Sequence, residues 1–195
     1  MTNLSIVVEG AEDVRFLQDF IQFHFGRKIE REAFIEVDGK TEKLFKAKSS
    51  IRTSTDGGKT NLLIFDADDK DYESTLGKVK SECDKLSLII DAIFLFPNNE
   101  SKGNLESLLR ECIPAENKAL LDCIKQYEAC KKNLASSTLR IIDSKEELFI
   151  YHGSFDSKIA GKAKATERNY SNPTIWNLDS PNLAKLKEFL SQYFT

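Results

Sequence analysis

Short runs of consecutive apolar residues alternate, in the first half of the chain, with segments whose apolar residues recur at helical spacing. The runs predict buried strands, because a strand that is apolar on both faces is typical of a parallel sheet covered by helices. We expect strands at residues 4–8, 33–37, 62–65 and 92–96, and helices at 14–25, 41–51, 72–86 and 105–112. This alternation predicts an α/β fold with right-handed crossovers.

The second half of the chain predicts mainly helices. Residues 115–132 form a long expected helix whose apolar face contains Leu120, Cys123, Ile124 and Tyr127. Residues 148–151 fit either a helix end or a strand, residues 175–178 favour a short strand or an extended packing segment, and residues 181–194 predict a terminal amphipathic helix. No repeat or linker interrupts the sequence, so we expect one domain, with an α/β core at 1–112 and a helical extension at 113–195.

Composition narrows the class of protein. With 41% hydrophobic and 30% charged residues, the chain is typical of a globular protein. Its net charge of −3 gives no overall basic surface, so affinity for nucleic acid would require a local patch. The amino terminus lacks a signal-peptide pattern and no apolar run approaches about 18 residues, so we expect a cytoplasmic protein with no membrane contact.

The four cysteines do not form a zinc motif. No C-x-x-C pair is present, and the chain has only two histidines. We expect buried structural thiols in a reducing compartment. The stretch Gly57–Thr60 imitates the end of a P-loop, but Thr53 stands where the first glycine belongs and the stretch precedes its strand, so we do not expect a nucleotide site.

Carboxylates follow two of the expected strands directly. Glu9 comes after residues 4–8, and Asp66, Asp68 and Asp69 come after residues 62–65. Ligands of open α/β sheets bind beyond the carboxyl ends of the strands, and oxygen ligands suit Mg²⁺ or Mn²⁺. The alternative is a polar turn that caps the next helix, the role we favour for Asp69.

These residues resemble known motifs. Val7-Val8-Glu9-Gly10-Ala11-Glu12-Asp13 resembles the glutamate motif of Toprim domains, and Phe65-Asp66-Ala67-Asp68 resembles their Asp-x-Asp motif. Such domains occur in topoisomerases, primases, ribosomal-RNA maturases and OLD-family nucleases. Residues 94–106 and 178–190 are similar to small stand-alone Toprim-like bacterial proteins of unknown function, so the resemblance spans nearly the whole chain.

The resemblance implies a mostly parallel Toprim-like sheet flanked by helices, with an acidic site that binds Mg²⁺ or Mn²⁺. Glu9 would be a ligand or general acid/base, and Asp66 and Asp68 would hold the metal. Asp13 and Glu106 match secondary acidic positions, although Glu106 could equally be a solvated first-turn acid. OLD-like nucleases also use a late lysine, and Lys162 and Lys164 are our candidates for contacting phosphate. The alternative for this basic stretch, which also contains Lys158 and Arg168, is a solvated helix face.

We therefore expect a Mg²⁺-dependent enzyme that acts on nucleic-acid phosphodiesters, and we favour a nuclease over other activities. The sequence does not distinguish DNA from RNA, nor does it give the oligomeric state. The alternative is a non-catalytic or partner-dependent module that works with a separate ATPase. A primase-like polymerase is a weaker hypothesis, because the sequence contains no evident zinc-binding or nucleotide-binding segment.

Overall fold

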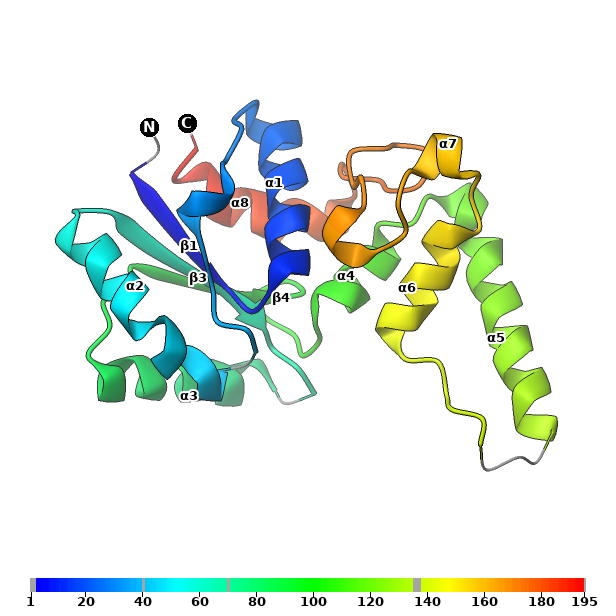
Figure 1. The fold of residues 1–195 in the computed structure, drawn as a ribbon, viewed down its shortest axis with the longest axis horizontal. Helices are drawn as coiled ribbons and strands as arrows, with labels where there is room; N and C mark the ends of the chain where they lie inside the picture. Colours follow the sequence, from blue (N-terminus) through cyan, green and yellow to red (C-terminus); the bar gives the residue numbers. More distant parts are fainter. Residues whose placement is uncertain (1–2, 40, 70, 135–137, 195) are drawn as a thin grey trace.

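A single parallel sheet forms the centre of the molecule. The computed structural model describes residues 3–39, 41–69, 71–134 and 138–194. Within these residues four strands pair in the order β2-β1-β3-β4, all of them parallel (Figure 1). The strands are β1 (Leu4–Val8), β2 (Phe34–Glu36), β3 (Thr60–Asp66) and β4 (Ala92–Phe96). The expected α/β fold is confirmed.

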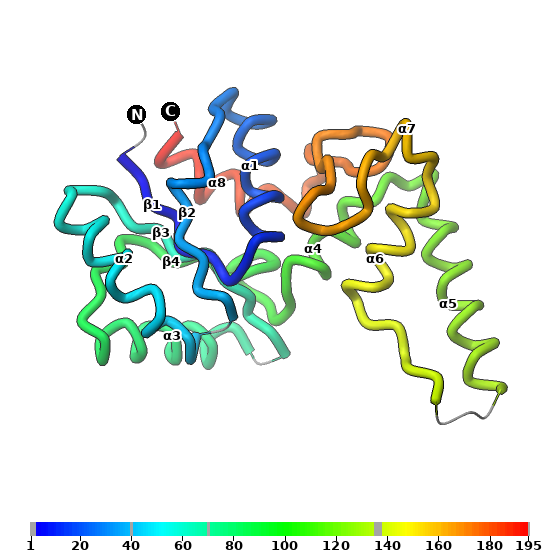
Figure 2. Tube along the Cα trace, in the orientation of Figure 1, coloured from blue at the N-terminus to red at the C-terminus, as the bar shows by residue number. Residues whose placement is uncertain are grey.

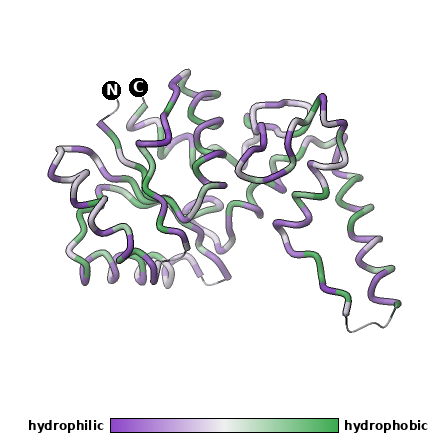
Figure 3. The backbone as a smooth tube through the Cα atoms, viewed as in Figure 1, coloured by the Kyte–Doolittle hydropathy of each residue, from purple (hydrophilic) through white to green (hydrophobic). Residues whose placement is uncertain are grey.

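Helices cover both faces of this sheet. The helices α1 (Ala11–Phe25) and α8 (Ala184–Ser191) lie on one face, and α2 (Leu44–Asp56) and α3 (Tyr72–Leu86) lie on the other. Successive strand residues point to opposite faces, so Ile6 and Val7 belong to two different hydrophobic clusters. Figure 3 shows the hydrophobic residues concentrated on the strands between these layers.

The helical extension begins after β4. It contains α4 (Leu105–Glu111), α5 (Lys118–Asn133), α6 (Ser144–Gly153) and α7 (Ser157–Ala160), so residues 148–151 are helical. The helices α5 and α6 lie side by side as a hairpin that projects away from the sheet, while the two chain ends lie close together at the opposite side (Figure 2). Short 3₁₀ turns occupy Arg31–Ala33, Thr41–Lys43, Ala115–Asn117, Ala165–Glu167 and Pro181–Leu183.

Two details of the loops differ from the sequence prediction. Of the two alternatives for residues 175–178, the strand does not form: the segment is turn-rich and packs instead, with Trp176 buried against Tyr151 and His152 of α6. Asp69 is not the cap of α3: the helix begins at Tyr72, and the carboxylate of Asp71 accepts the N–H of Ser74 at 2.9 Å. Asp69 lies two positions too early for this role and is exposed.

The predicted apolar face of α5 is right for Ile124 and in part for Leu120, but wrong for Cys123 and Tyr127. Leu121 and Ile124 are its buried residues, whereas Cys123 and Tyr127 are exposed. The reason is that α5 packs on α6 along one side only. Buried thiols are therefore confirmed for Cys83 and Cys112 but not for Cys123 and Cys130. No helix built from the described residues is long and apolar enough to cross a lipid bilayer.

Candidate functional site

The carboxyl ends of β1 and β3 bring two predicted site residues together. The two strands are parallel neighbours, with Val8 beside Ile64, so the residues that follow them emerge at the same edge of the sheet. The backbone N–H of Asp66 donates to Glu9 Oε1 at 3.1 Å. Glu9 and Asp66 therefore lie side by side, as the two acid-tipped runs of the sequence predicted.

Asp13 joins them from the first turn of α1. Its Oδ2 atom accepts the N–H of Gly10 at 2.8 Å, which satisfies one of the open donors at the start of the helix. Burial raises the pKa of Asp13 to about 7. The hydrogen bond from Gly10 lowers this pKa, while the charges of Glu9, Glu12 and Glu106 raise it further. Asp13 therefore lies close enough to the other acids of the site for their charges to affect its pKa.

Asp66 links the sheet to α4. Its Oδ1 atom accepts the N–H of Leu105, the first residue of α4, at 2.9 Å. Burial raises the pKa of Asp66 well above its ordinary value, and the charges of Asp13, Glu106 and Asp68 raise it further. Removing the proton from Asp66 is therefore unfavourable unless a positive charge approaches.

Asp68 is held by backbone contacts beyond the strand. Its N–H donates to the carbonyl of Gly103 at 2.7 Å, and the N–H of Gly103 donates back at 2.8 Å. Asp68 adopts a left-handed conformation with φ of 57°, which aspartate tolerates better than most residues. At Gly103, with φ of 140°, an added Cβ would lie 2.7 Å from Ser107 Oγ, so this bridge requires glycine.

Glu106 faces the interior rather than solvent. Asn104 caps α4 by accepting the N–H of Ser107 at 2.9 Å, and this start places Glu106 in the first turn with only 4% of its surface exposed. The Nζ atom of Lys145, in the first turn of α6, lies 3.2 Å from Glu106 Oε1. The alternative of a solvated first-turn acid is wrong for Glu106.

Lys145 is a cation that lies beside these acids, and the sequence analysis missed it. Partial burial lowers its pKa, but the charges of Glu106, Glu12 and Asp66 outweigh burial, so the pKa is raised overall. The candidates Lys162 and Lys164 both pair with Glu167 on the surface instead. No local pattern distinguishes Lys145 from the other exposed lysines, because its proximity to the acids depends on how α6 packs against α4.

A second missed contact fixes the start of α1. Arg168 is almost fully buried, and its Nη1 atom lies 3.1 Å from Glu12 Oε1. The hydroxyl of Tyr170 donates to the same oxygen at 3.2 Å. Burial raises the pKa of Glu12, although Arg168 opposes this shift. Arg168 is thus an internal partner of α1, which excludes it from the solvated helix face considered for this basic stretch.

The donor set suits a hard divalent cation. Carboxylate oxygens are the ligands that Mg²⁺ and Mn²⁺ prefer. Burial raises the pKa values of Asp13 and Asp66 most, and the repulsion among the acids, which a cation would relieve, raises them further. The described residues contain no group of three or more His, Cys, Asp or Glu side chains already arranged to hold a metal ion. Backbone donors and Lys145 hold Glu9, Asp66 and Glu106 in place, so binding would require these side chains to reorient.

The raised pKa of Asp13 predicts a pH-dependent stability. The folded state binds this proton more tightly than the unfolded chain, whose pKa lies near 3.8, so the free energy of unfolding should fall as the pH rises from about 4 to about 7. We expect urea denaturation to show a smaller loss between about pH 5 and about pH 8 in Asp13→Asn than in the parent. The exposed control Asp56→Asn should behave like the parent. Equal losses in the parent and Asp13→Asn would contradict a buried, protonated Asp13.

Fold and site together define an α/β protein that carries a group of carboxylates at the carboxyl edge of a parallel sheet. The chain belongs to the family described as "Protein of unknown function (DUF3226)", whose model matches residues 4–195. The comparisons with curated proteins and with solved structures gave no match.

Proposed function

We propose that this protein is a nuclease that requires Mg²⁺ or Mn²⁺ and hydrolyses phosphodiester bonds of nucleic acid. The observation that supports the proposal most strongly is the convergence of Glu9, Asp13, Asp66 and Glu106, from the turn after β1 and from α1, β3 and α4, at one edge of the sheet. This edge is where open parallel sheets bind their ligands. The resemblance of residues 7–13 and 65–68 to Toprim motifs supports the same function.

The carboxylates would have two roles, metal binding and proton transfer. Glu9, Asp66 and Asp68 would hold the metal, which when bound supplies a Lewis acid and an acidic water. Glu9 could also act as general acid/base. Asp13, with a pKa of about 7, is close to half protonated at neutral pH, so it can accept or release a proton under the conditions of the reaction. Asp13 and Glu106 would support the metal ligands.

Lys145 replaces Lys162 and Lys164 as the residue that we assign to the phosphate. A phosphodiester entering an acidic site needs a nearby cation, because its negative charge is otherwise repelled. Lys145 lies against Glu106 and retains a side chain that is 71% exposed, so its ammonium group can also reach an incoming ligand. Lys162 and Lys164 instead lie beside Glu167.

The test is cleavage of labelled single- and double-stranded DNA and RNA with Mg²⁺, Mn²⁺ or EDTA. We expect cleavage with either metal and none with EDTA. In Glu9→Gln the cleavage rate should fall by about 10-fold to 100-fold. The substrate that is cut identifies the nucleic acid. A folded parent protein that binds Mn²⁺ but cuts none of the four substrates would contradict the proposal, and would favour a module that depends on a partner such as an ATPase.

The same assay separates the three lysines. Lys145→Met should lower cleavage by about 100-fold even at saturating Mn²⁺, because the variant lacks the cation that we assign to the phosphate. Lys162→Met and Lys164→Met are the matched controls and should retain the parent's rate. Full activity of Lys145→Met would remove Lys145 from the proposed site.

A further inference from the structure

Glu106 is a carboxylate that the fold encloses beside a flexible cation. Its side chain, in the first turn of α4, is 4% exposed, and Lys145 Nζ lies 3.2 Å from its Oε1 atom. A carboxylate buried to this extent is unfavourable unless a countercharge lies next to it. Lys145 supplies that countercharge from the first turn of α6, through a four-carbon stem on a side chain that remains 71% exposed.

The ammonium group of Lys145 is attracted by more than one acid of the site. Partial burial lowers the pKa of Lys145, and the charges of Glu106, Glu12 and Asp66 together raise it by more. The group therefore lies where the negative potentials of acids from three elements overlap. A divalent cation is attracted to the same place for the same reason, so the two positive charges compete for these carboxylates.

The position of α6 does not depend on Lys145 alone. A second ion pair joins the same two helices, with Arg110 of α4 lying 3.1 Å from Glu147 of α6. Leu148 of α6 is also buried in the hydrophobic cluster that contains α4. Lys145 can therefore leave Glu106 by rotation of its own side chain while the two helices stay packed.

We propose that the ammonium group of Lys145 holds the place of the metal ion in the metal-free protein, and that it leaves Glu106 when the metal binds. This inference rests on the metal site of the proposed function. Glu106 stays neutralised in the exchange, because it gives up one positive charge and gains two. Lys145 is then free to turn toward the phosphate of the nucleic acid, so the metal binds before the substrate.

The exchange can be tested by the affinity of the full-length protein for Mn²⁺, measured calorimetrically without nucleic acid. A site that is open in about one molecule out of ten binds about ten times less tightly than one that is always open. Lys145→Met should therefore lower the dissociation constant of Mn²⁺ by at least about 10-fold.

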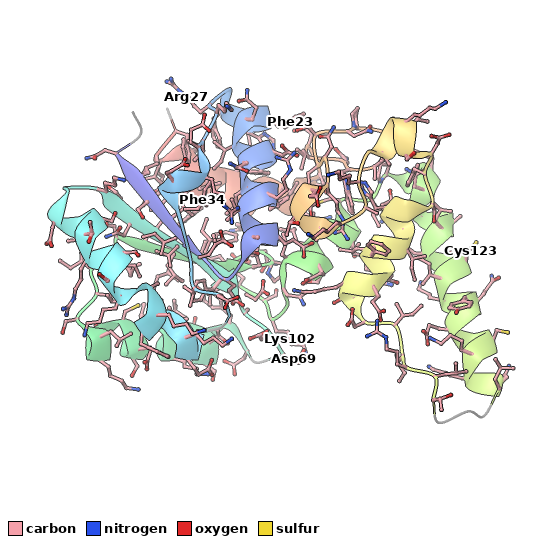
Figure 4. All side chains as sticks on the ribbon, in the orientation of Figure 1. Phe23, Arg27, Phe34, Asp69, Lys102 and Cys123 are labelled. Carbon is pink, nitrogen blue, oxygen red and sulfur yellow. The ribbon has the colours of Figure 1, made fainter. Side chains whose placement is uncertain are left out.

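Lys102→Met is the matched control. Figure 4 shows Lys102 at the outer end of the loop that follows β4, on the same edge of the sheet, and its side chain is exposed. The variant removes an equal charge from the surface, where salt screens it, so its dissociation constant for Mn²⁺ should stay within about twofold of the parent's.

A crystal structure of the parent protein with Mn²⁺ bound tests the exchange without any variant. It should show Lys145 Nζ beyond ion-pair distance of Glu106, with Arg110 still paired with Glu147. Equal dissociation constants in the parent and Lys145→Met, or a Mn²⁺ complex in which Lys145 still pairs with Glu106, would overturn the exchange and leave the nuclease proposal standing. Absence of Mn²⁺ binding from both proteins would overturn the metal site and the exchange together.

Discussion

Asp66→Asn should sharply lower metal-dependent cleavage and at the same time stabilise the metal-free protein. The asparagine retains an oxygen that can accept the N–H of Leu105, so the local structure should persist. The substitution removes a buried carboxyl group whose pKa is raised by burial and by the charges of Asp13, Glu106 and Asp68. In EDTA, at about pH 8, we expect its melting temperature to exceed that of the parent by at least about 2 °C, which corresponds to about 1 kcal/mol.

Adding metal should reverse this order of stability. At a concentration about 100 times the dissociation constant, a cation stabilises the parent by about 2.7 kcal/mol, whereas a protein that has lost a ligand gains less. Cleavage by Asp66→Asn should fall at least about 100-fold. Asp69→Asn, an exposed acid of the same loop, is the control and should match the parent in both measurements. An Asp66→Asn protein that gains as much stability from Mn²⁺ as the parent does would show that Asp66 is not a ligand.

Arg168→Met should cause the largest loss of stability, about 3–5 kcal/mol, or roughly 6–20 °C in melting temperature. Arg168 is 1% exposed, and its guanidinium binds Glu12 at 3.1 Å and the carbonyl of Ala163 at 2.9 Å. Methionine fills much of the same volume but leaves the Glu12 carboxylate without its main countercharge. The loss should be larger at about pH 8 than at about pH 5, because a protonated Glu12 no longer needs a countercharge.

A double-mutant cycle would isolate this ion pair. Glu12→Gln combined with Arg168→Met should be more stable than the sum of the two single losses predicts, because the buried charge that Arg168→Met leaves behind is gone. Arg52→Met is the control: Arg52 is an exposed arginine that donates to the carbonyl of Leu86, and the variant's loss of stability should stay within about 0.5 kcal/mol. Strict additivity in the cycle would show that Glu12 and Arg168 do not stabilise each other.

The α/β core was predictable because its signals are local. Each strand is a run of consecutive apolar residues, and α1 ends at Gly26, whose φ of 64° favours glycine at a helix end. The face of α5 was not predictable in the same way. Apolar residues lie around much of the circumference of α5, so their spacing does not indicate which of them contact α6. Cys123 and Tyr127 have helical spacing whether they are buried or exposed.

The candidate site was predictable where it depends on adjacent parallel strands. Glu9 follows β1 and Asp66 ends β3, and these two strands pair directly, so the sequence pattern alone indicated that the two acids meet. The positive charges were not predictable, because Lys145 and Arg168 reach the acids through packing between distant segments. Arg168 stands in a stretch with three lysines, and nothing local shows that it turns inward while Lys162 and Lys164 remain at the surface.

The order of synthesis gives the buried pair of Arg168 and Glu12 a further consequence. The two residues are 156 positions apart, so the strands and α1 leave the ribosome well before Arg168 does. The first turn of α1, which carries Glu12 and Asp13, obtains the countercharge of Arg168 only when residues 161–170 reach α1. The acidic edge of the sheet is therefore completed late in translation, and a chain released before that point lacks the contact that fixes it.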